Sequence, residues 1–139
     1  MKDSLKTLER VKKFEIDEQR RVLMQKLEQE ENLQKKLKNL IDDYENEKEF
    51  VSQYPTLCDF GAYTKQHLKK RRELEEQIAE MQKEIEQIRD IIAEMFKEQK
   101  TFEIVSKNRK KRKNKELADQ EQKLLDEVGT NTYIKKHQQ

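Results

Sequence analysis

The chain has 139 residues, of which 32% are hydrophobic and 43% are charged. So few apolar side chains cannot surround a wide interior, which excludes a compact globular domain and favours elongated helix. Basic and acidic residues number 31 and 29, so the overall charge does not attract the chain to nucleic acid or to a membrane.

The first periodic segment predicts a helix over about residues 4–52. Large or apolar residues recur at every seventh position, with Glu30 as the polar exception, and others fill the intervening half-turns. The heptad positions are Ile16, Leu23, Leu37, Tyr44 and Val51, and the intervening ones are Leu27, Leu33, Leu40 and Ile41. Leu5, Leu8 and Val11 continue an apolar face in a shifted phase, so we expect looser packing near the N-terminus.

A turn is predicted over about residues 53–62, the only stretch in which helix-breaking residues gather around the single Pro55. Asp59 is the expected N-cap of the returning helix, because its carboxylate can accept free amide protons of the first helical turn. A small apolar plug is expected to close this tip, built from Leu57, Phe60 and Tyr63.

The second periodic segment is more regular and predicts a helix over about residues 63–126. Its seam steps by alternating four and three through Leu74, Ile78, Met81, Ile85, Ile88, Ile92 and Met95. Gly129 is expected to stop this helix and to leave a C-terminal tail over 129–139. The predicted fold is therefore all-α, a long two-helix antiparallel coiled-coil hairpin in one coiled-coil domain over residues 1–139.

Residues that would carry catalysis or bind metal are sparse and scattered. Cys58 is the only cysteine, which excludes an internal disulfide and fits a reducing compartment, and His67 and His137 are the only histidines. A two-helix rod encloses no concave, partly dry pocket, so we expect no enzyme activity, no cofactor and no metal. No apolar run approaches the ~20 residues of a membrane span or resembles a signal peptide, so we expect a soluble, cytoplasmic chain.

One segment departs from the mixed-charge pattern. Residues 107–115 contain seven basic residues in nine and no acidic one, and acidic residues resume at Glu116. These side chains point all round a helix, which is typical of a solvated turn. They would also suit an acidic protein surface, the phosphates of nucleic acid or lipid headgroups, or a nuclear localisation signal in a eukaryotic protein.

Several short stretches match a known family in order and spacing. They are residues 8–21, residues 60–63 followed by Arg71 and Arg72, and residues 93–97, 100–104 and 124–127. Together they resemble the flagellar export protein FliJ family, especially its alphaproteobacterial form, which is related to the stalk proteins of type III secretion systems. The resemblance covers nearly the whole chain.

The resemblance implies a bacterial cytoplasmic protein that is peripheral at the inner-membrane export apparatus. Proteins of this family resemble the two-helix shaft of rotary ATPases and bind the hexameric export ATPase with the pole that carries both chain ends. They also contact the cytoplasmic domain of the export gate and handle export chaperones. Nucleic acid is not expected as a partner, nor is direct insertion into the membrane. A generic coiled-coil scaffold or dimerisation protein is the alternative, since the heptads alone would suit it.

The resemblance also suggests contact residues. Leu40, Ile41, Asp42 and Tyr44 are similar to a stretch that contributes to the gate-facing surface, although Leu40 and Tyr44 equally occupy seam positions. The ATPase-facing pole would contain Leu5, Leu8, Arg10, Lys12 and Lys13 on the first helix and Leu117, Leu124 and Leu125 on the second. The basic segment 107–115 departs from the mixed Arg/Glu pattern of the family. The charge complementarity between family members and the ring of the hexameric export ATPase is therefore not assumed for this chain.

Overall fold

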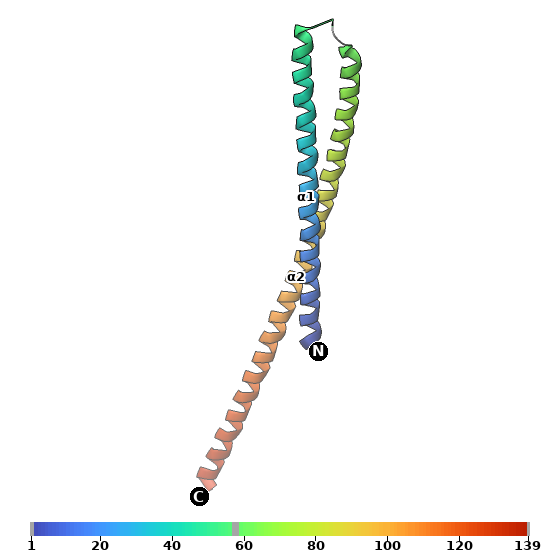
Figure 1. Ribbon diagram of the computed structural model, residues 1–139. Coiled ribbons are helices and arrows are strands. Elements are labelled where there is room, and N and C mark those ends of the chain that lie inside the picture. The colour runs from blue at the N-terminus through green and yellow to red at the C-terminus, as the bar shows by residue number, and fades with distance from the viewer. Residues whose placement is uncertain (1, 57–58, 139) are drawn as a thin grey trace. The chain divides into compact units, whose positions relative to one another are not determined.

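The computed structural model describes residues 2–56 and 59–138, and within these ranges it consists of two helices (Figure 1). Helix α1 spans Lys2–Gln53 and helix α2 spans Phe60–Gln138. The all-α antiparallel hairpin predicted from the heptads is confirmed. No described helix offers an uninterrupted apolar length that would carry it across a lipid bilayer.

Contacts divide the chain into two units, and each is described by itself. The hairpin unit comprises Lys13–Phe96, in which α1, the turn and the first part of α2 pack together. The terminal unit comprises Met1–Lys12 and Lys97–Gln139, in which the start of α1 lies beside α2. Helix α2 contributes to both units.

The core of the hairpin unit is one side chain wide. Ile16, Ile78 and Ile85 are 2%, 7% and 3% exposed, and the remaining predicted seam residues of both helices are half-buried. This is the expected result of two-helix packing, because each seam side chain meets the opposite helix but stays open on its flanks. The predicted seam from Leu74 to Met95 is confirmed at all seven positions.

Polar contacts also join the two helices of the hairpin unit. Glu30, the polar exception in the first heptad series, accepts a hydrogen bond from Gln82 at 3.0 Å. Lys26 Nζ lies 3.0 Å from Glu84 Oε2, which accepts no aligned hydrogen bond from any described residue, so this contact is a simple ion pair. The guanidinium of Arg20 lies 5.0 Å from the centre of the Phe96 ring.

The turn between the helices is tighter than predicted. The amide of Tyr54 donates a hydrogen bond to the carbonyl of Val51 at 3.1 Å, and the amide of Ala62 donates to Asp59 Oδ1 at 3.3 Å. Asp59 is therefore the N-cap, as predicted. Helix α2 begins immediately after it, at Phe60 rather than near residue 63, because the cap satisfies an amide of the first turn.

The C-terminal end of α2 differs from the prediction. The helix does not stop near residue 126 but continues through Gly129 to Gln138, so the tail expected over 129–139 is wrong. A glycine ends a helix when it adopts a left-handed backbone, and neither glycine has a positive φ. Gly129 otherwise costs only about 1 kcal/mol of helix propensity relative to alanine, which does not by itself interrupt a long helix.

Candidate protein-binding surfaces

A cluster of stacked rings lies at the turn end of the hairpin unit. Tyr44 of α1 has its ring centre 5.5 Å from that of Phe60, 6.1 Å from that of Tyr63 and 4.1 Å from that of His67. We call these four residues the tip cluster. The hydroxyls of Tyr44 and Thr64 lie 3.1 Å apart and share a hydrogen bond.

The tip cluster corresponds in part to the predicted plug. Phe60 and Tyr63 stack on each other at 5.8 Å, as that prediction requires, whereas Leu57 lies outside the described residues. His67 was missed, although a signal existed: it follows Tyr63 by four positions and so lies on the same face of α2.

His67 is the one buried polar side chain of the described residues, with 5% of its surface exposed. Burial lowers the pKa of its imidazole below the usual 6.5, the Arg71 guanidinium lowers it further, and Glu45 opposes them weakly. Its Nε2 atom has no hydrogen-bond partner among the described residues. The neutral ring therefore acts mainly as a flat packing surface for Tyr44.

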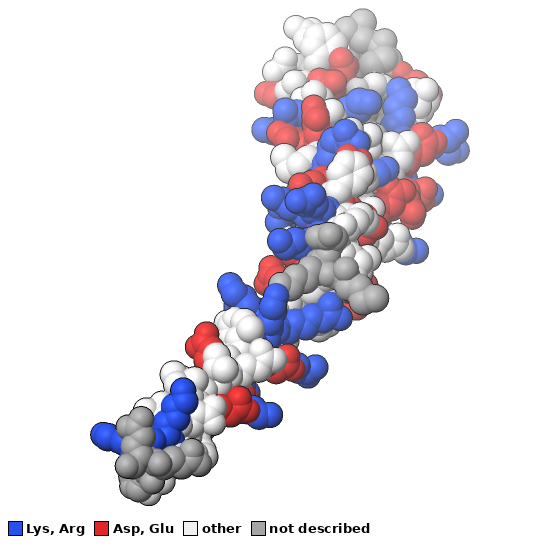
Figure 2. All heavy atoms as spheres, turned by 90° about the horizontal axis from the view of Figure 1, so that it is seen from below, with Lys and Arg blue, Asp and Glu red and all other residues white. Residues whose placement is uncertain are grey.

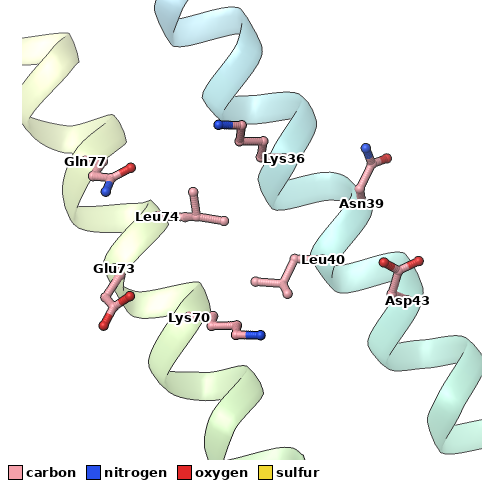
Figure 3. Close-up of a pocket in the computed structure, with 8 residues that line it drawn as sticks. All are labelled: Lys36, Asn39, Leu40, Asp43, Lys70, Glu73, Leu74 and Gln77. Atoms are coloured by element: carbon pink, nitrogen blue, oxygen red, sulfur yellow. The ribbon is translucent and has the colours of Figure 1, made fainter.

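Leu40 lies in a shallow groove between the helices of the hairpin unit. Leu40 of α1 and Leu74 of α2 point toward each other across its floor (Figure 3). Charged and amide side chains form the rim, namely Lys36, Asn39, Asp43, Lys70, Glu73 and Gln77, around a volume of about 370 Å³. The apolar floor is thus part of the helix packing, and the surface offered to a partner is the charged rim.

The residues predicted to face the export gate therefore differ in their exposure. Leu40, Ile41 and Tyr44 are half-buried between the helices, and only Asp42 is exposed. The first three residues contribute to the packing of the two helices. A partner would contact only the part of each of these side chains that remains exposed.

A basic groove lies in the terminal unit, where the first turns of α1 border α2. Leu5 and Lys6 of α1 line it together with Ser106, Arg109, Lys110 and Lys113 of α2, around a volume of about 420 Å³. Four cationic side chains and no acidic one surround this space. Elsewhere the two signs of charge are interleaved over the visible face (Figure 2), so the groove is a local concentration of positive charge.

From the basic groove onward α2 runs past the start of α1 with no second helix beside it (Figure 1). Every described side chain of residues 106–132 is exposed. We call residues 106–132 the free arm. Three residues predicted to face the ATPase lie on it, Leu117, Leu124 and Leu125, with 49%, 61% and 64% of their surfaces exposed.

The residues of α1 that were predicted to face the ATPase differ in their exposure. Leu5 is half-buried in the basic groove, Leu8 is 49% exposed, and Arg10 is exposed. Lys12 forms an ion pair with Glu98 of α2 and keeps 17% of its side chain exposed. Lys13 is exposed but belongs to the hairpin unit.

Comparison with known proteins complements this geometry. The family model described as flagellar FliJ protein matches residues 1–138, nearly the whole chain. No curated protein and no solved structure matches significantly. Within the described residues no three or more His, Cys, Asp or Glu side chains gather in a way that could hold a metal ion.

Proposed function

The chain belongs to the flagellar FliJ protein family, a component of flagellar protein export, and on this premise we propose that it works as a stalk-like coiled coil. In this role it binds the hexameric export ATPase through the terminal unit. It contacts the cytoplasmic domain of the export gate through the hairpin unit and handles export chaperones. The protein acts in the bacterial cytoplasm, peripheral to the inner membrane.

The observation that carries the ATPase part of this proposal is the free arm. In proteins most of the stability of a helix comes from packing of its apolar face, and the free arm retains exposed Leu117, Leu124 and Leu125. A partner that surrounds the helix would cover them. On α1, Leu5, Leu8 and Arg10 belong to the same unit and are the further contact residues that we propose. We also propose Lys13, which follows the terminal unit along α1 and belongs to the hairpin unit. Lys12 contributes indirectly through its ion pair with Glu98.

The gate contact that we propose uses the groove around Leu40. Its rim carries two lysines, an aspartate and a glutamate, which suits a polar and reversible interface rather than a permanent one. Asp42 is exposed on α1 between the groove residues Leu40 and Asp43, and the tip cluster, whose Tyr63 is 37% exposed, lies further toward the turn on the same unit. Tyr44 supports this surface from beneath through its stacked rings.

Co-purification with the cognate export ATPase tests the proposal. The wild-type chain is expected to bind the ATPase and to change its hexamer formation or turnover. Leu117→Asp combined with Leu124→Asp is expected to weaken binding by more than about tenfold, because both exposed leucines lose their apolar contact.

The matched control is Met24→Asp, since Met24 is 66% exposed but belongs to the hairpin unit. It is expected to bind like the wild-type chain. If the wild-type chain neither binds the ATPase nor alters its assembly or turnover, the proposed role at the ATPase is wrong. Equal binding by the double leucine variant would remove the free arm from the interface.

A further inference from the structure

The free arm carries two consecutive segments of opposite charge. The basic segment, residues 107–115, has seven basic residues and no acidic one. The acidic segment, residues 116–127, has five acidic residues and a single Lys123. All of these side chains are exposed, so neither segment neutralises the other by folding. A helix with this order of charges is complementary to an identical helix that runs in the opposite direction.

The two segments also share one face of α2. At ~100° per residue, the side chains between residues 107 and 128 that lie within about 40° of one line are Lys110, Lys113, Leu117, Glu121, Leu124 and Val128. Their steps of three and four are those of a coiled-coil seam, although no described residue packs against them beyond the basic groove. The face begins with cations, continues through apolar residues and includes Glu121.

The basic groove is shaped to receive the far end of such a face. Leu5 supplies an apolar wall, while Lys6, Lys110 and Lys113 supply positive charge. Leu124, Val128 and Glu121 offer the complementary apolar and acidic groups on another copy of the arm. The fit is mutual under two-fold symmetry, because each copy presents both a groove and an acidic end.

We propose that two copies of this chain associate through their free arms, in antiparallel orientation, with the basic segment of each copy along the acidic segment of the other. Leu117 lies near the two-fold axis, and the apolar residues of each acidic end pack at the basic groove of the partner. This inference goes beyond the proposed function and does not depend on it. It describes how the free arm is covered when no other partner occupies it.

Nucleic acid and lipid headgroups fit this face less well. Both are polyanions, and the acidic segment that follows the basic one along the same helix would repel them. A second copy satisfies both segments at once. Because the attraction is largely between exposed charges, the association is expected to be reversible and to weaken as salt is added.

Sedimentation equilibrium of the full chain tests the proposal. At about 50 mM salt the average mass is expected to rise from 17.0 kDa toward twice that value as the concentration approaches about 1 mM, and to fall back at about 0.5 M salt. A mass that stays at 17.0 kDa throughout would overturn the proposal, including the case in which the arm serves a different protein.

Two charge-reversed variants sharpen the test. Lys110→Glu with Lys113→Glu leaves only acidic charges on this face, and Glu121→Lys leaves only basic ones. Glu127→Lys, on the flank of the face, is combined with Glu121→Lys so that each variant reverses two charges. Each variant alone is expected to associate at least about tenfold more weakly than the wild-type chain, since like charges then oppose each other in both halves of the dimer. An equimolar mixture is expected to recover association, because both halves of the mixed dimer pair opposite charges.

The matched control is Lys65→Glu with Lys69→Glu, which changes the net charge by the same amount as the Lys110 and Lys113 variant but alters exposed lysines of the hairpin unit. It is expected to associate like the wild-type chain. Circular dichroism of each variant verifies that its helix content equals that of the wild-type chain. A mixture that fails to recover, or a control that dissociates as much as the arm variants, would overturn the antiparallel pairing.

Discussion

The contact between His67 and Tyr44 links the protonation of a buried side chain to the stability of the hairpin tip. The imidazole is stacked 4.1 Å from the Tyr44 ring, and its Nε2 atom has no partner among the described residues. A proton on this ring would place a charge in a buried position near the Arg71 guanidinium. The neutral form therefore stabilises the folded state, and the charged form opposes it.

The sign of the pH dependence follows from the lowered pKa. Unfolded His67 binds a proton near pH 6.5 whereas the folded residue binds it only at lower pH, so stability present above 6.5 is lost as pH falls toward the folded pKa. We expect the melting temperature to fall between about pH 7.5 and about pH 5 in the wild-type chain, and to fall less in His67→Phe. Thermal melts followed by circular dichroism measure this.

His137 is present in both chains and so does not distinguish them. Glu45 lies close enough to raise the pKa slightly, and Glu45→Gln is therefore expected to steepen the loss in the wild-type background. Identical pH profiles for the wild-type chain and His67→Phe would contradict a role for the buried imidazole.

At the scale of elements, helix α2 combines a packed half with an exposed half. Its seam residues meet α1 up to the basic groove, after which every described side chain is exposed. Exposed helix is held mainly by its own backbone hydrogen bonds and local side-chain contacts, such as the bond from Gln122 to Asp126 at 3.1 Å. The free arm is therefore the element most sensitive to helix propensity.

Gly129→Ala tests that sensitivity. An added Cβ at Gly129 meets nothing within 4 Å, and the backbone is already helical, so alanine is expected to stabilise the arm locally by about 1 kcal/mol. Amide hydrogen exchange at low protein concentration should slow around residues 124–134 and stay unchanged between Leu74 and Met95. Unchanged exchange near residue 129 would contradict a helix that continues through this glycine.

For the whole molecule, stability depends on a narrow seam rather than on an enclosed core. Three aliphatic side chains in the described residues are buried, and all lie in the hairpin unit. Dispersion and burial at these few positions must therefore support much of the fold, while the interleaved charges of the surface contribute little individually.

Ile85→Ala is expected to lower the free energy of unfolding by about 2–4 kcal/mol, because Ile85 is 3% exposed and its loss opens a cavity at the seam. Ile91→Ala is the control, since Ile91 is on the same helix and in the same unit but is 44% exposed. It should cost well under about 1 kcal/mol. Urea denaturation measures both, and equal losses would contradict the seam as the source of stability.

Family membership and the all-α hairpin could both be predicted from the sequence. The reason is that heptad spacing reports directly which face of a helix is apolar, and the order of short stretches reports the family. Asp59 could also be assigned as the N-cap, because capping depends on a few neighbouring residues. The end of α2 could not, since a single glycine weakens a helix without deciding whether it stops.

Only the tertiary structure decided which residues meet across the two helices. Periodicity leaves the alignment of two distant segments open, and contacts such as those of Glu30 with Gln82 and Tyr44 with His67 show which residues lie opposite each other. The alignment also determines that α1 begins beside the basic groove, which leaves the free arm exposed. The sequence by itself determined the two helices and their apolar faces, whereas their pairing decided which surfaces remain available for partners.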